Sequence, residues 1–151
     1  MVGHWRSTHV LRFTDSKMAT FQLDIVTPEK TVYAGEIEHF QAPGVDGSFG
    51  VLARHQPLLA ALGIGRIGFR EADGTERTLA ISGGFANVSG DGATILAEAA
   101  EFGDEIDIGR ARAARDRAQE RLDNRTPDVD VERAQTALAR AFCRLRVSGA
   151  E

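Results

Sequence analysis

The feature that most constrains the fold of this chain is an abrupt change of composition after Asp104. Before that residue, short runs of alternating or β-branched apolar residues are separated by turn residues, many of them glycine. After it, two segments are rich in alanine, arginine, glutamate and glutamine, which favour helices. We therefore expect an N-terminal extension at 1–19 that is disordered, a β body at 20–104, a helical hairpin at 105–147 and a tail at 148–151.

The β body shows the periodicity of strands. Phe21, Leu23 and Ile25 alternate with polar residues, which is the pattern of a half-buried strand. Asp73-Gly74 lies between two such runs and indicates a hairpin turn. Ser82-Gly83-Gly84 is likewise interpreted as a tight turn between strands. About eight to ten short strands with these breaks favour an antiparallel sandwich or barrel over a parallel α/β sheet.

Two narrow apolar stripes, at 106–122 and 131–147, predict a pair of helices. Their spacing of three or four residues is typical of helices that pack closely against each other. Such narrow stripes stabilise a pair only weakly, so we expect the hairpin to be mobile. The stripe residues are Ala111, Ala114, Ala118 and Leu122, followed by Val131, Ala134, Leu138, Ala141 and Leu145.

The distribution of charge limits the class of partner. Residues 21–104 carry 12 acids against 5 bases, whereas 105–151 carry 9 acids against 10 arginines. An acidic body argues against nucleic acid as the main partner. The more basic hairpin leaves open an acidic protein surface or a small phosphate ligand. The longest apolar stretch, 56–65, is too short to span a bilayer, so any membrane association must come through a partner.

No catalytic or metal-binding residue can be assigned from the motifs. A phosphate-binding loop needs a lysine after a glycine-rich turn, and neither Lys17 nor Lys30 lies in such a context. The four histidines and the single cysteine, Cys143, show no spacing suited to zinc. His55 is more notable because it sits in a loop-like stretch, although a solvated histidine would look the same.

Several segments, taken in order, resemble the epsilon subunit of bacterial F-type ATP synthases. The resemblance covers most of the chain after the extension, although Arg54 stands where the family usually has glycine or asparagine. The segments are 23–29, Gly50-Val51-Leu52, His55-x-Pro57-Leu58-Leu59, Ser82-Gly83-Gly84-Phe85 and Ile106-Asp107-Ile108-Gly109-Arg110-Ala111.

This resemblance implies a ten-stranded antiparallel β-sandwich joined to an antiparallel two-helix hairpin. It also implies a non-catalytic rotor subunit that contacts the gamma subunit, the c-ring and the alpha/beta hexamer, and that couples proton translocation to ATP synthesis. The hairpin would inhibit ATP hydrolysis when extended into the hexamer. The protein would lie peripherally at the cytoplasmic face of the bacterial inner membrane, held there by the complex.

The resemblance also implies contact residues. The ring-facing positions are Asp46, Gly47, Ser48 and His55, and Ser48 replaces the acid that several relatives carry, which puts a salt bridge from that position in doubt. Hairpin arginines would meet an acidic segment of the beta subunit, although a solvated basic helix would look the same. These arginines are Arg112, Arg115, Arg117 and Arg121.

No cofactor is required, but the resemblance implies a regulatory ATP between sandwich and folded hairpin. Guanidinium groups pair well with phosphate oxygens, and Arg140 and Arg144 are one helical turn apart. Alternatively, Asp107 and Arg110 only cap the helix and the other arginines are solvated. The expected site is Glu101, Ile106, Asp107, Arg110, Ala111, Arg140 and Arg144. A free-standing nucleotide-responsive regulator and an enzyme with a sandwich active site remain competing function classes.

Overall fold

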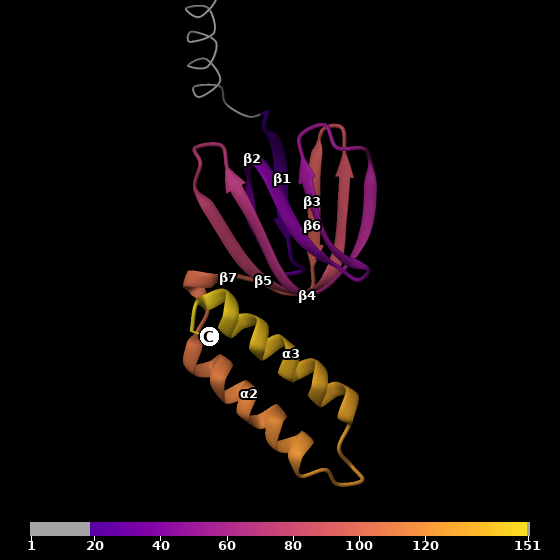
Figure 1. Cartoon of the computed structure of the whole chain (residues 1–151), viewed down its shortest axis with the longest axis vertical. Helices are drawn as coiled ribbons and strands as arrows, with labels where there is room; N and C mark the ends of the chain where they lie inside the picture. The colour runs from indigo at the N-terminus through magenta and orange to yellow at the C-terminus, as the bar shows by residue number, and fades with distance from the viewer. Residues whose placement is uncertain (1–18, 151) are drawn as a thin grey trace, which may run out of the picture.

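The computed structural model describes residues 19–150, so the predicted disordered extension lies almost wholly outside the described residues. A β body is followed by a short 3-10 turn and two helices (Figure 1). The elements are β1 (Phe21–Val26), β2 (Thr31–Gly44), β3 (Gly47–Leu52), β4 (Leu58–Glu71), β5 (Glu76–Ser89), β6 (Gly92–Ala97), β7 (Ala100–Phe102), η1 (Gly103–Glu105), α2 (Ile108–Asp123) and α3 (Val131–Ser148).

The β body is a single sheet that closes on itself. Its strands run in the order β1-β6-β5-β4-β2-β3, and an additional β1–β2 pairing joins five of them into a ring. β3 pairs with the second half of β2 outside the ring, and β7 pairs with β5. All pairings are antiparallel except β1 with β6, which is parallel. The predicted β body and two-helix hairpin are confirmed, but the count of ten strands is wrong: residues 19–150 contain seven.

The strand count was overestimated because several glycines bend strands instead of ending them. Gly63 lies inside β4, and Gly83 and Gly84 lie inside β5, so the predicted tight turn at 82–84 is also wrong. Gly83 and Gly84 have φ values of +75° and +140°, which favour glycine. Glycine in a strand interior commonly marks such a bend, which lets one long strand follow the curved sheet.

The main core fills the closed sheet with alternating side chains. Leu23, Ile25 and Phe40 are fully buried, as the period-2 pattern of their strands requires. Tyr33 packs against Phe69 with ring centroids 4.6 Å apart, and the Phe69 ring also meets the Phe102 ring edge-on. Each fully buried side chain of this size contributes roughly 1.5–3 kcal/mol. The β body therefore has a substantial core that needs no residue from the hairpin.

The two helices form an antiparallel pair whose ends are set by local signals. Asp107 caps α2 by accepting a hydrogen bond from Arg110 N, and Asp130 caps α3 by accepting one from Arg133 N. Gly149 ends α3 in the left-handed conformation. The predicted stripes are confirmed, because every member is buried or half-buried in the pair.

The hairpin is folded against one end of the β body, and α3 makes the contact. Figure 1 shows the two helices beneath the lower ends of the strands, with the 124–130 loop furthest away. A second apolar cluster forms the junction, drawn from β5, α2, α3 and the linker before α2: Ala80, Ile106, Ala111, Cys143 and Leu145. No helix within residues 19–150 is both long enough and apolar enough to cross a membrane.

Candidate functional site

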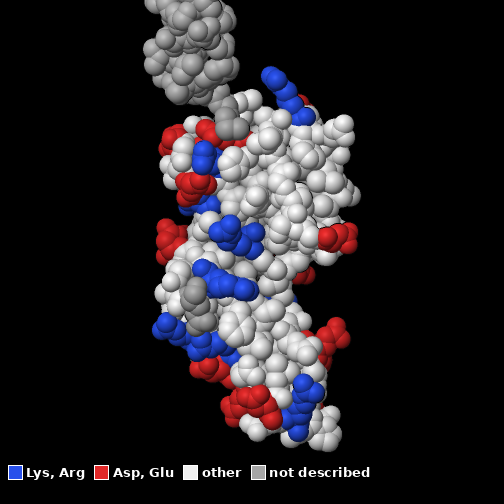
Figure 2. Space-filling view, in the orientation of Figure 1, with Lys and Arg blue, Asp and Glu red and all other residues white. Residues whose placement is uncertain are grey.

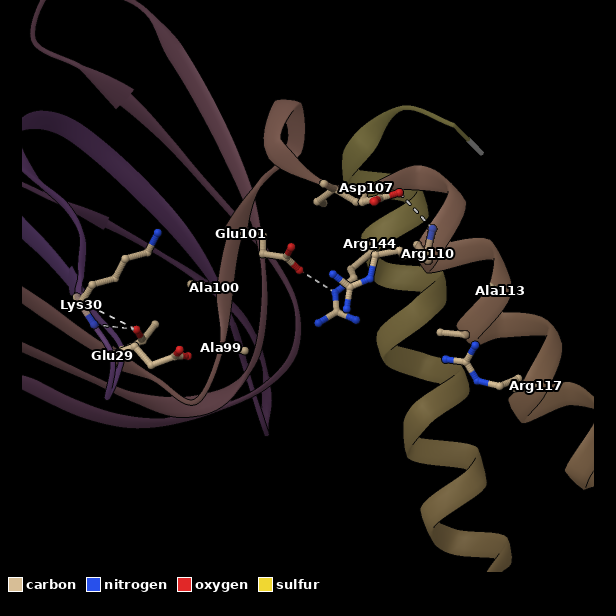
Figure 3. Close-up of a pocket in the computed structure, with 14 residues that line it drawn as sticks. Glu29, Lys30, Ala99, Ala100, Glu101, Asp107, Arg110, Ala113, Arg117 and Arg144 are labelled. Carbon is tan, nitrogen blue, oxygen red and sulfur yellow. Dashed lines mark hydrogen bonds and ion pairs between the residues drawn. The ribbon is translucent and has the colours of Figure 1, made fainter.

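A cleft of about 630 Å³ lies between the β body and the hairpin (Figure 3). This volume suits a ligand of small-molecule size. One side is formed by the turn between β1 and β2, which carries Glu29 and Lys30. Residues 99–101 line it next, and α2 with one residue of α3 forms the opposite side. The cleft therefore exists only while the hairpin is docked.

Six of the seven residues predicted for the ATP site line this cleft. Arg140 does not: it is exposed and borders a much smaller hollow beside Cys143. Arg140 and Arg144 thus lie one turn apart without sharing the cleft. The six that the structure brings together are Glu101, Ile106, Asp107, Arg110, Ala111 and Arg144.

Ion pairing already organises part of the cleft. Arg144 Nε donates to Glu101 Oε1 at 2.7 Å, which joins α3 to β7. The side chains are 35% and 40% exposed, so the pair contributes at most about 1 kcal/mol. Asp107 Oδ1 is occupied as the helix cap, 3.1 Å from Arg110 N. The exposed guanidinium groups of Arg110 and Arg117 leave the helix side of the cleft rich in positive charge.

The two apolar residues predicted to flank a base contribute little open surface. Ile106 and Ala111 border the cleft, but both are buried in the junction cluster with Leu145. Their main contact is therefore with the β body and α3. Cys143 lies in the same cluster, and burial raises the pKa of its thiol, an effect only partly offset by Arg146 and Arg144. Within the described residues, no cluster of three histidine, cysteine, aspartate or glutamate side chains is suited to a metal ion.

Sequence reasoning missed the residues of the β1–β2 turn and assigned Arg117 elsewhere. Thr27, Glu29 and Lys30 line the cleft, although about 80 residues separate them from α2. No periodic signal links segments so far apart in the chain. The one usable signal was Lys30 itself, because it is the sole lysine within residues 19–150.

The predicted ring-facing residues fall into two groups at opposite ends of β3. Asp46 lies in the exposed β2–β3 turn, and Gly47 and Ser48 are the exposed first residues of β3. His55 lies in the β3–β4 loop, with Nδ1 2.7 Å from Gln56 O. Arg54 has a φ of +64°, which is uncommon for a residue other than glycine. Glycine or asparagine at this position would adopt that conformation more easily.

The four hairpin arginines do not form one surface. Arg112 and Arg121 are exposed, Arg117 lines the cleft, and Arg115 is half-buried and pairs with Asp116 at 3.1 Å. Acidic and basic groups are mixed over the hairpin, whereas a broad part of the β body carries no charge in this view (Figure 2). The hairpin is therefore not a uniformly basic helix pair.

A second hollow, of about 660 Å³, is largely apolar and belongs to the β body alone. The side chains of Phe85 and Leu96 border it and are 53% and 52% exposed. Val26, Pro28 and Leu62 complete much of its wall. Large exposed apolar side chains grouped in this way are typical of a protein interface.

Comparison with known proteins decides the family. Residues 20–103 match the family model described as "ATP synthase, Delta/Epsilon chain, beta-sandwich domain". Residues 104–149 match the model described as "ATP synthase, Delta/Epsilon chain, long alpha-helix domain". The chain belongs to the ATP synthase delta/epsilon family. The family predicted from the sequence motifs is therefore confirmed.

Relatives within the delta/epsilon family are similar over nearly their whole length. The ATP synthase epsilon chain of Syntrophomonas wolfei is 45% identical over 130 residues, which cover 86% of this chain and 95% of that protein. The ATP synthase epsilon chain of Nitratidesulfovibrio vulgaris strain DP4 is 48% identical over 130 residues, which cover 86% of this chain and 96% of that protein.

Solved structures of mitochondrial ATP synthases share the fold of this delta/epsilon family member. The Euglena gracilis complex of OSCP, F1 and c-ring contains a chain with a TM-score of 0.72 and 21% identity, covering 85% of this chain and 81% of that one. The central stalk and c-ring of the Tetrahymena thermophila mitochondrial ATP synthase contains a chain with a TM-score of 0.58 and 14% identity. The match covers 88% of this chain and 99% of that one.

Proposed function

We propose that this chain is the non-catalytic epsilon subunit of a bacterial ATP synthase rotor, which couples proton translocation to ATP synthesis and restrains ATP hydrolysis. The observation that carries the proposal is the match of both family models across residues 20–149. The high identity to bacterial epsilon chains over 86% of the sequence supports it. The complex would hold the protein peripherally at the cytoplasmic face of the inner membrane.

The apolar hollow of the β body is the proposed binding site for the gamma subunit. Phe85 and Leu96 project from strands whose other residues build the main core, so they are held on a rigid surface. Covering them would remove large apolar groups from water, which is the main driving force of association. This surface also favours the rotor over a free-standing nucleotide-responsive regulator, which would leave it uncovered.

The exposed turns at the ends of β3 are the proposed contacts with the c-ring. Asp46 lies in the β2–β3 turn with Ser48 just after it at the start of β3, and His55 lies in the β3–β4 loop. Because Ser48 carries no charge, hydrogen bonding replaces ionic attraction at that position. Arg54, exposed beside His55, supplies a positive charge to the same surface.

The hairpin is the proposed regulatory element. Its docking cluster is small compared with the main core, so the hairpin can leave the β body without unfolding it. Once extended, the hairpin would meet an acidic segment of the beta subunit through Arg112, Arg115, Arg117 and Arg121. Removal of residues 105–151 should then raise ATP hydrolysis by the assembled complex, and an unchanged rate across a range of ATP and salt would refute the inhibitory role.

The cleft is the proposed site of a regulatory ATP. A ligand that binds between β body and docked hairpin stabilises the docked state, because the site is absent when the hairpin extends. Arg110 and Arg144 supply charge-assisted hydrogen bonds to phosphate, for which Arg144 must exchange part of its pairing with Glu101.

Co-purification tests the rotor assignment. The full chain should bring down the gamma subunit and the alpha/beta hexamer, and Leu96→Asp should lose them because it places a charge in the apolar hollow. Leu52→Asp is the matched control, since Leu52 is similarly exposed, at 55%, but does not line the hollow. Retention of gamma by Leu96→Asp would place gamma on another surface. Failure of the wild-type chain to bind gamma would refute the rotor assignment.

A further inference from the structure

The β1–β2 turn gives the cleft a positive charge that comes from the β body and not from the hairpin. Glu29 and Lys30 occupy one side of the cleft, while Arg110, Arg117 and Arg144 occupy the other (Figure 3). An anion between them would contact both parts of the protein. Lys30 forms no ion pair with any acid in the described residues, so its ammonium group is available to a ligand.

The backbone of Lys30 is fixed by a buried threonine. Thr27 is 9% exposed and is the sole buried polar residue among residues 19–150. Its amide donates to Lys30 O at 2.9 Å, and its hydroxyl donates to the same oxygen at 3.3 Å. The hydroxyl also accepts from Lys30 N at 3.3 Å. Three hydrogen bonds thus hold the turn at the edge of the cleft, with the side chain of Lys30 exposed.

The balance of charge makes this lysine useful to a polyanion. Two of the acids at the cleft are already occupied, Glu101 by Arg144 and Asp107 by the first turn of α2. Glu29, beside Lys30, has no such partner among the described residues, so it is the single unpaired negative charge on this side of the cleft. A ligand with several phosphates gains more binding energy from a positive charge on the second side of the cleft than a monophosphate does, because its own charge extends further across the cleft.

The geometry points to Lys30 as the phosphate contact contributed by the β body, and to Thr27 as the residue that positions it. This inference rests on the proposed nucleotide site. The ligand's phosphate chain lies between Lys30 and the arginines of the helices, with its far end towards the turn. Lys30 therefore determines selectivity for phosphate-chain length, so that nucleoside triphosphates and inorganic triphosphate bind in preference to monophosphates.

Calorimetry on the full chain tests the role of Lys30, with ATP, AMP and inorganic tripolyphosphate as probes. Lys30→Gln should weaken ATP and tripolyphosphate about tenfold or more, because one charge-assisted hydrogen bond is lost. AMP should be affected little. Lys30→Arg should keep most of the affinity, since it retains the charge. Arg66→Gln is the control, because it removes a charge from an exposed residue of the β body that does not line the cleft.

Thr27→Val tests the positioning role separately. The change keeps the shape of the side chain but removes the hydroxyl, so the triphosphate preference should shrink while circular dichroism shows an intact fold. Equal ATP affinity of Lys30→Gln and wild type would overturn the inference and leave the nucleotide site standing. An equal loss for AMP and ATP would overturn the chain-length role. No binding by the wild type at millimolar ATP would remove both, while the gamma co-purification would still test the rotor assignment.

Discussion

Substitution of Leu145 by alanine should release the hairpin while leaving the β body folded. Leu145 is 0% exposed and lies in the junction cluster with Ala80, Ile106 and Ala111. A buried Leu→Ala change costs about 2–5 kcal/mol, and the lower part of that range applies here, because the small neighbouring side chains can move in and close part of the cavity. A cost of about 2–3 kcal/mol raises the undocked fraction roughly 30- to 150-fold.

The single cysteine reports directly on this equilibrium. Cys143 is buried in the same cluster, and burial raises the pKa of its thiol, so labelling requires the hairpin to open. When opening is fast compared with labelling, the labelling rate follows the undocked fraction, and it should rise by the same factor in Leu145→Ala. Leu59→Ala is the matched control, since Leu59 is 71% exposed and its loss should change the rate little.

A second variant separates docking from local damage near the thiol. A side chain at Gly103 would come within 2.5 Å of Val147 O, so Gly103→Val should also push α3 from the β body. Hydrogen exchange of β1 and β6 should stay unchanged in both variants, because these strands belong to the main core and contribute no residue to the junction cluster. An unchanged labelling rate in both variants would refute the docking argument. Faster exchange of the strands would show that the hairpin and β body unfold as one unit.

Two further predictions concern charged and titrating groups. Glu101→Gln removes the ion pair with Arg144, so Cys143 labelling should quicken at most about fivefold at low salt and match wild type at 1 M salt, because the pair is half-exposed. A difference that persists in high salt would show that the pair acts through more than charge. Burial, with a hydrogen bond and negative charge from Glu71, raises the pKa of Tyr33 to about 12, so spectroscopic titration of this sole tyrosine should have its midpoint near 12 in the folded protein. Because the unfolded phenol ionises near its ordinary pKa of 10.0, the contribution of Tyr33 to stability is complete below that pH and is lost as the pH rises towards 12. A midpoint near 10 in the folded chain would contradict this.

The helical hairpin was predictable because its signals are local. Caps such as Asp107 and Asp130 lie within four residues of the groups they bind, and the apolar stripes recur every turn. The strand count was not predictable in the same way. A glycine such as Gly63 looks the same in the sequence whether it ends a strand or bends one. Only the pairing of β4 with β5 on both sides of Gly63 shows that the strand continues through it.

The candidate site was predictable only where a motif carried it. Residues of the helix opening, such as Asp107 and Arg110, lie where the family resemblance puts them, whereas Arg140 sits outside the cleft. Lys30 was missed because its proximity to α2 arises from closure of the sheet. That closure depends on the parallel pairing of β1 with β6, which joins the first strand of the body to a strand about 70 residues later.

The hairpin is attached near its two open ends and free at its loop, which makes it a mechanical lever. α2 has 16 residues and is therefore about 24 Å long, so a rotation of roughly 10° at the junction moves the 124–130 loop by about 4 Å. Movements too small to disturb the junction cluster are thus large at the tip. Mutations at the junction and contacts at the tip should consequently influence each other across the full length of the helices.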